Sequence, residues 1–123
     1  MRVNVGDIVL AQYGKFDGTS TDGLFLVIYH EAYDGMAGSN NFTAIKVSSL
    51  PRSYQIPLSR FEAPFLDHDS YINCSTQFRF TENNVHRIFG QVSRSKIQKV
   101  MDQLNNYNNS IMKQLHFVSK SYK

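Results

Sequence analysis

The residues whose types could do chemistry are scattered along the chain, and the pair His30-Glu31 is the first candidate. A histidine beside a carboxylate can act as a base whose orientation the carboxylate controls. Neighbouring residues of a strand point to opposite faces, so these two side chains would meet only if the chain bends there. A histidine at the solvated end of a strand is the simpler interpretation.

Three other candidates have a simpler structural interpretation beside the functional one. The segment 67–69, Asp-His-Asp, has metal-ligating side chains but no distant partner at ligand spacing, so it indicates a turn. Cys74 falls within a predicted strand, where a small core residue is more common than a nucleophile. The cluster Arg94, Lys96 and Lys99 could bind phosphate or an acidic peptide, or could form a solvated helix face. Because the sequence contains no P-loop, dinucleotide fingerprint or zinc pattern, we expect no cofactor and no metal.

The composition is that of one small globular domain, spanning residues 1–123. Hydrophobic residues make up 41% of the chain, which excludes a disordered protein. The net charge of +3 permits a nucleic-acid partner without arguing for one. The single cysteine forms no internal disulfide, and no apolar run approaches the roughly 20 residues of a membrane span. We therefore expect a cytoplasmic protein with no membrane association.

Six runs of β-branched, aromatic and aliphatic residues predict strands. They cover residues 8–13, 24–29, 42–47, 54–58, 70–80 and 86–92. Pro57 cannot donate to a ladder, so the strand 54–58 is expected at a sheet edge. The loops 14–23 and 31–41 are rich in Gly, Asn and Ser, and are the expected carriers of function.

After residue 92 the hydrophobic period changes to that of a helix. Its apolar face holds Ile97, Val100, Met101, Leu104, Ile111 and Leu115. Ser93 is the expected N-cap. The Asn-rich run 105–110 predicts that the helix stops near Leu104 and that a second short helix follows over 110–117. The resulting fold class is mostly β (α+β), an SH3-like, partly closed antiparallel barrel with a C-terminal helix.

Five segments, in this order, resemble the PemK/MazF toxin family of the CcdB/MazF/Kid superfamily. They are Val5-Gly6-Asp7-Ile8-Val9-Leu10, Leu24-Phe25-Leu26-Val27-Ile28, Thr43-Ala44-Ile45-Lys46-Val47-Ser48-Ser49, Cys74-Ser75-Thr76-Gln77-Phe78-Arg79 and Ile88-Phe89-Gly90-Gln91-Val92-Ser93. The last is followed by the helical pattern of Ile97, Val100 and Leu104. The resemblance covers about residues 4–104 and leaves 105–123 as a C-terminal helical extension.

The resemblance implies a metal-independent endoribonuclease that forms a homodimer and is neutralised by an antitoxin lying over its RNA groove. In such enzymes the ribose 2′-OH attacks the adjacent phosphate, which requires a base, an acid and a cation over the phosphorane. Carried onto this sequence, the catalytic residues would be Arg79 and a hydroxyl from Ser48 or Ser49. Contacts to RNA or to a partner protein such as an antitoxin would come from Lys15, Thr19, Gln77 and His30.

The sequence departs from the family at the catalytic Arg-Pro pair, where Gly23 and Leu24 stand instead. Lys15 is the only basic residue in the preceding loop. Arg79 also has a structural interpretation, as the partner of Glu82 or Asp69 in an ion pair. The alternative function is therefore a non-catalytic, phage- or plasmid-borne member that binds a partner protein, RNA or DNA through the same groove.

A third interpretation sets the family aside. An unrelated SH3-like or OB-like barrel could bind nucleic acid by stacking bases on Tyr71, Phe78 and Phe80. Phe78 and Phe80 share one face of the predicted strand, where burial in the core is the more common outcome.

Overall fold

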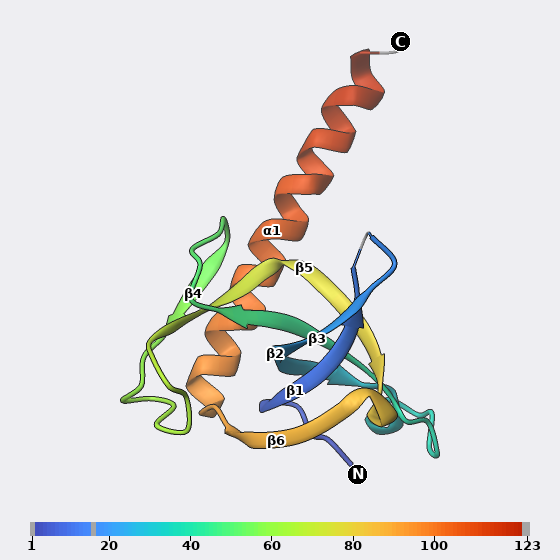
Figure 1. The fold of residues 1–123 in the computed structure, drawn as a ribbon. Coiled ribbons are helices and arrows are strands. Elements are labelled where there is room, and N and C mark those ends of the chain that lie inside the picture. The colour runs from blue at the N-terminus through green and yellow to red at the C-terminus, as the bar shows by residue number, and fades with distance from the viewer. Residues whose placement is uncertain (1, 16, 122–123) are drawn as a thin grey trace.

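The computed structural model describes residues 2–15 and 17–121, with side chains described as far as Lys113. Along these described residues, six strands, two short 3-10 helices and one long helix follow one another, as Figure 1 shows by colour. They are β1 (Asp7–Gly14), β2 (Ser20–His30), η1 (Glu31–Tyr33), β3 (Asn41–Ser48), β4 (Gln55–Leu58), β5 (Ser70–Thr81), η2 (Glu82–Asn84), β6 (Val85–Gln91) and α1 (Arg94–Ser121). The mostly β fold with a C-terminal helix is confirmed.

The strands form one antiparallel sheet in the order β4-β5-β3-β2-β1-β6. The strand that contains Pro57 is at the edge, as predicted from its missing N–H. The sheet is strongly curled and not closed, since β4 and β6 do not pair. It bends most at β5, which pairs Gln77 with Ile45 and Ile72 with Val47, so that residues 73–76 bulge opposite Lys46.

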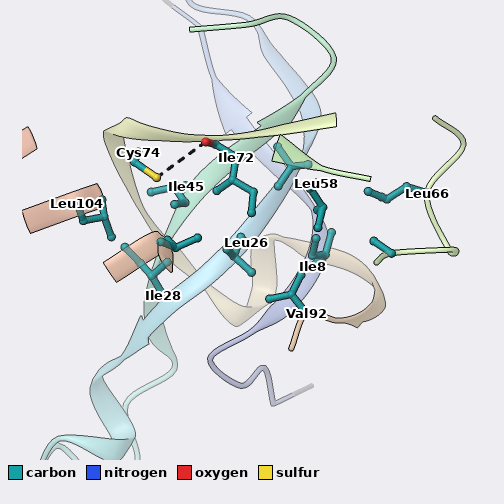
Figure 2. Packing of buried hydrophobic residues seen from close by; sticks show 13 residues of the cluster. Ile8, Leu26, Ile28, Ile45, Leu58, Leu66, Ile72, Cys74, Val92 and Leu104 are labelled. Atoms are coloured by element: carbon teal, nitrogen blue, oxygen red, sulfur yellow. Dashed lines mark hydrogen bonds between the residues drawn. The ribbon is translucent and has the colours of Figure 1, made fainter. Parts of the chain in front are cut away.

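The two faces of the sheet bury separate apolar clusters. One face packs against α1, and the cluster between them contains Ile8, Leu26, Ile45 and Ile72 from the sheet and Val100 and Leu104 from the helix, among others (Figure 2). The other face is the inside of the curl and is rich in aromatic rings, with Val9, Phe25, Val27, Phe42, Ala44 and Phe80. Period-two alternation along β3 assigns its residues to the two clusters, because successive side chains point to opposite faces.

The first loop is shorter than the sequence predicts. β1 continues to Gly14 and β2 begins at Ser20, so that the ladder runs to the pair Gly14–Ser20 and only residues 15–19 connect the strands. Polar residues of the expected loop take part in pairing, as Tyr13 does with Thr21. Such residues are tolerated here because this end of the hairpin projects from the sheet into solvent.

The helix does not stop near Leu104, and the predicted second helix over 110–117 is the continuation of α1. The side chains of Asn105, Asn106, Asn108 and Asn109 are exposed, so their cost to the helix is only their intrinsic propensity. Tyr107, in the middle of this run, packs edge to face on Tyr54 with ring centroids 5.1 Å apart. This tertiary contact outweighs the local preference of the Asn-rich run.

The N-terminal end of α1 is formed as the sequence predicts. The Ser93 hydroxyl accepts a hydrogen bond from the Lys96 N–H at 3.2 Å. Lys96 is not part of an exposed basic face with Arg94 and Lys99, because its ammonium donates to Glu62 Oε1 at 2.7 Å and is 9% exposed. Within the described part of the chain, no helix has the length and apolarity to cross a membrane.

Candidate functional site

A groove opens between β1, the β1–β2 connection and β5. Its volume is about 780 Å³, and its lining residues are Tyr13, Gly14, Lys15, Asp17, Thr76 and Phe78. β1 and β5 are not neighbours in the sheet, since β2 and β3 lie between them. The curl of the sheet therefore brings the two walls together.

Aromatic rings form the lower walls of this groove. The Tyr13 ring meets Phe78 at a centroid distance of 5.8 Å, and both pack edge to face on Phe25, at 5.4 and 5.2 Å. Phe25 is fully buried, whereas Tyr13 and Phe78 are only partly buried. The buried ring holds the other two in place, so the groove presents a fixed aromatic surface on which a flat ligand can stack.

Lys46 brings a positive charge to the same face. Its Nζ donates a hydrogen bond to the Tyr13 hydroxyl at 2.8 Å and lies 5.0 Å from the centre of that ring. Lys46 pairs with Phe25 across β2 and β3, and its other neighbour is the bulge 73–76 that includes the lining residue Thr76. The half-buried Lys46 therefore adjoins the wall of the groove that Tyr13 forms.

The predicted binding residues Lys15 and Thr19 occupy the turn at the rim. Lys15 is exposed and lines the groove. The Thr19 hydroxyl and N–H both donate to Asp17 Oδ1, at 2.6 and 3.0 Å. The hydroxyl first, and then the N–H, hold the pKa of Asp17 below its ordinary value. Thr19 thus shapes the turn and favours the ionised form of Asp17.

Arg79 and Ser48, the expected catalytic pair, are not brought together. Arg79 lies opposite Thr43 and Ser48 opposite Tyr71. The two therefore lie five residues apart along β3, about 16 Å at ~3.3 Å per residue. Arg79 pairs with Glu31 at 2.6 Å and not with Glu82 or Asp69, the partners considered from the sequence.

The serines at the end of β3 have local roles. The Ser48 hydroxyl accepts from the Leu50 N–H at 3.2 Å and contacts the Leu50 carbonyl at 3.3 Å. Ser49 is exposed in the bend that follows. Ser48 shares the inner face of β3 with Lys46, two residues away, because strand residues alternate.

His30 is 1% exposed and belongs to a junction that holds the N-terminal segment. Its Nδ1 accepts from the Ala32 N–H at 3.1 Å, and its Nε2 lies 3.4 Å from Glu82 Oε2 and 3.2 Å from an Arg2 nitrogen. The chain does bend after His30, into η1, but the Glu31 carboxylate then accepts from Arg79. The structure therefore places His30 away from the groove and away from Glu31 as a partner.

The remaining predicted residues lie on β5. Gln77 is exposed between Thr76 and Phe78, on the opposite face from Phe78. Cys74 is buried in the core beside α1, as predicted, and burial raises the pKa of its thiol to about 11. Tyr71 does not join Phe78 and Phe80 in one platform, since it pairs with Pro57 and Ser48 at the other end of β5.

Sequence reasoning missed Tyr13 and Lys46 as members of the site. A signal for Lys46 was present, because it is the one charge in the apolar run 42–47 and shares a face with Phe42 and Ala44. Such a lysine needs a partner within reach. Its partner Tyr13 is 33 residues away in sequence, and only the curl of the sheet brings them together.

Comparison with known proteins identifies the fold through solved structures. No family model matches the sequence, and no curated protein matches it. A mycobacterial endoribonuclease in complex with its cognate antitoxin aligns with a TM-score of 0.67 and 12% identity, over 85% of this chain and 92% of that chain. The Mycobacterium tuberculosis toxin MazF-mt6 aligns with a TM-score of 0.66 and 16% identity, over 84% and 96%.

A chain of the MazE–MazF structure from Deinococcus radiodurans aligns with a TM-score of 0.68 and 12% identity, over 89% of this chain and 98% of that chain. At these identities the comparison bears on architecture, and it agrees with the resemblance drawn from the five sequence segments. The chain has the fold of the MazF-type toxins.

Proposed function

We propose that this protein is a MazF-type toxin that binds single-stranded RNA in the groove between Tyr13 and Phe78. The observation that carries the proposal is the pairing of an aromatic wall with positive charge on one concave face. Single-stranded nucleic acids are bound in this way, with bases stacked on aromatic rings and phosphates on basic residues. The fold shared with endoribonucleases supports RNA as the ligand.

The test is fluorescence anisotropy with a labelled single-stranded RNA of mixed sequence, beside a DNA of the same sequence. Stacking contributes about 1–3 kcal/mol per base, so Phe78→Leu should weaken RNA binding about fivefold to a hundredfold. Phe61→Leu is the matched control, because the Phe61 side chain is 97% exposed and lies outside the groove. Equal affinities for the wild type and both variants would overturn the assignment of the groove.

RNA cleavage is the second candidate function, favoured by one observation. Lys46 and Ser48 share the inner face of β3, about 7 Å apart along the strand. A cation and a hydroxyl at this spacing could stabilise the phosphorane that forms when the 2′-OH attacks phosphorus and the 5′-oxygen leaves. Position 23 is a glycine and not an arginine, and Arg79 is paired with Glu31. Both observations favour binding without cleavage.

Cleavage is tested by incubating a long RNA with the protein in EDTA, beside the variants Ser48→Ala and Arg79→Ala. Fragments ending in 2′,3′-cyclic phosphate, lost in Ser48→Ala, would establish a metal-independent endoribonuclease. Loss in Arg79→Ala instead would assign the chemistry to the end of β5 that carries the Glu31–Arg79 ion pair. Intact RNA with folded protein would leave binding as the function.

The proposed partners of this protein are a cognate antitoxin and a second copy of the chain, in the cytoplasm. One of the similar structures is a complex with an antitoxin, which supports the first. The lining of the groove is mainly apolar, and an antitoxin segment would bury it. An antitoxin encoded beside this gene should therefore compete with labelled RNA for the groove. Separately, light scattering on the purified protein should give the mass of a dimer. RNA that stays bound at saturating antitoxin would contradict a shared groove.

A further inference from the structure

Lys46 has neutral partners, whereas most other basic side chains with described contacts pair with a carboxylate; Arg87, over the Phe89 ring, is the other exception. Arg79 pairs with Glu31 at 2.6 Å, Lys96 with Glu62 at 2.7 Å and Arg2 with Glu82 at 3.5 Å. Among the described residues, no carboxylate lies within 4.0 Å of the Lys46 ammonium, whose contacts are the hydroxyl and ring of Tyr13. Its positive charge therefore has no carboxylate in direct contact within the described part of the chain.

The hydrogen bond to Tyr13 fixes the ammonium without exhausting it. An ammonium has three N–H donors, and one is used by the Tyr13 oxygen. That oxygen accepts from Lys46, so the phenolic proton of Tyr13 stays free to donate elsewhere. The pair can thus offer two N–H donors and one O–H donor to the same ligand. A group of clustered donors with a net positive charge is suited to an anion with several oxygens.

Gly23 explains why the charge comes from β3. A Cβ at Gly23 would lie 3.1 Å from a Tyr13 ring carbon and 3.1 Å from a Phe25 ring carbon. A longer side chain there would displace the rings that form the groove wall. Because Leu24 pairs with Val47, Gly23 adjoins Ser48 on the strand that carries Lys46. The Lys46 side chain comes from the neighbouring strand, and its ammonium reaches the Tyr13 hydroxyl at 2.8 Å.

We infer that Lys46, which contacts the groove wall through Tyr13, binds a phosphodiester, and that Tyr13 positions its ammonium. The inference rests on the proposed RNA-binding function, because it places one backbone phosphate of the bound strand beside the wall that Tyr13 forms. Asp17, at the rim, is the carboxylate among the lining residues and is held by Thr19. Asp17 repels phosphates that approach it, whereas the Lys46 ammonium has no carboxylate partner among the described residues.

The test is the salt dependence of RNA binding by Lys46→Met. Removing one phosphate contact to a single strand lowers the slope of log K against log salt by about 0.7, and loss of a charged hydrogen bond weakens binding about tenfold. Lys99→Met is the matched control, since Lys99 is exposed on α1, which packs on the other face of the sheet. An unchanged slope for Lys46→Met would overturn the inference even where the wild type binds RNA.

Tyr13→Phe separates positioning from charge. The variant keeps the ring and the lysine, so the salt slope should stay at the wild-type value while affinity falls about threefold to tenfold. A slope reduced as far as in Lys46→Met would show that the ammonium leaves the site without its acceptor. An affinity equal to that of the wild type would remove Tyr13 from the proposal.

A titration with inorganic phosphate distinguishes a failure of this inference from a failure of the proposed function. Lysine side chains labelled with 13C at Cε are followed by NMR while inorganic phosphate is added. The Lys46 signal should shift at a lower phosphate concentration than that of Lys99. If the protein binds no RNA but this shift occurs, the RNA proposal fails and the anion site stands. If Lys46 and Lys99 respond alike, the anion site fails.

Discussion

Tyr13 on β1 and Phe78 on β5 meet edge to face with ring centroids 5.8 Å apart, although β2 and β3 separate their strands in the sheet. A flat sheet would hold residues three strands apart at roughly 14 Å, at ~4.8 Å per strand. The contact therefore marks how strongly the sheet curls and why the groove exists. The same rings pack on Phe25 and line the groove where we propose that RNA binds, so we expect stability and binding to be coupled at this site.

The hydroxyl of Tyr13 should contribute to stability through Lys46. Tyr13→Phe leaves the ammonium without its acceptor in a half-buried position, so the free energy of unfolding should fall by about 1 kcal/mol. Urea denaturation measures this. Tyr29→Phe is the control, because the Tyr29 hydroxyl donates to Asp34 at the surface, where the loss should be near zero. Equal losses in both variants would contradict a special role for the Lys46 contact.

Gly90 is required by the ring of Phe65. A Cβ at this position would lie 2.6 Å from two Phe65 ring carbons, so Gly90→Ala should destabilise the protein by about 1–3 kcal/mol. Thermal or urea unfolding checks the size. Adding Phe65→Leu should recover part of the loss, which a purely backbone effect would not allow. Gly14→Ala, where a Cβ meets nothing within 4 Å, should stay close to the wild type.

Features determined by neighbouring residues could be predicted from the sequence. Pro57 lacks an N–H whatever the tertiary structure, and its strand is at the sheet edge. Ser93 caps the first turn of α1 through a contact three residues away. The helix end was predicted wrongly, because the Asn-rich run is weak locally and is held by Tyr107 against a residue from another element.

The residues of the candidate site are brought together by the register of strand pairing, which could not be predicted from the sequence. Arg79 and Ser48 fall in segments that resemble one family's motifs. However, Arg79 of β5 pairs with Thr43, which lies five residues from Ser48 along β3. Lys46 and Tyr13 each have only a weak and separate signal in the sequence. Lys46 is a charge in an apolar run, and Tyr13 is an aromatic residue near the end of a strand. Only the curl across three strands, β1, β2 and β3, makes them one pair. Local sequence patterns do not predict contacts between residues that are far apart in the sequence.

The contact between Tyr54 and Tyr107 should carry measurable coupling. Their rings meet edge to face at 5.1 Å, and such pairs contribute about 0.5–1.5 kcal/mol beyond burial. A double-mutant cycle with Tyr54→Leu and Tyr107→Leu, read by urea unfolding, should give a coupling energy in that range. Asn108→Ala, exposed on the same helix, should raise stability by roughly 0.5 kcal/mol. A coupling near zero would mean that the helix passes the Asn-rich run without this contact.

The native thiol of Cys74 should resist alkylation. Burial raises its pKa to about 11, so roughly one molecule in a thousand carries the thiolate at pH 8. The side chain is also packed in the core beside α1. Mass spectrometry after iodoacetamide should show modification at least a hundredfold slower in buffer than in denaturing urea. Rates within tenfold of each other would show that the β5 bulge opens readily.

Glu62 should make stability depend on pH in the acid range. The hydrogen bond from Lys96, and then that from the Ser59 N–H, lower the pKa of Glu62 from 4.5 to about 2. A carboxyl whose pKa is lower in the folded state stabilises the fold above the unfolded value. That stabilisation is complete above about pH 5 and is lost as pH falls from 4.5 towards 2.

The urea midpoint measured from pH 6 to pH 2.5 tests this direction. Glu62→Gln removes the titrating group, so its midpoint should fall less over this range than that of the wild type. The Glu62 side chain is 41% exposed, and solvent screening keeps the difference small. Lys96→Met removes the first cause of the lowered pKa and should flatten the same part of the curve. A wild-type slope in both variants would show that other carboxylates control the acid transition.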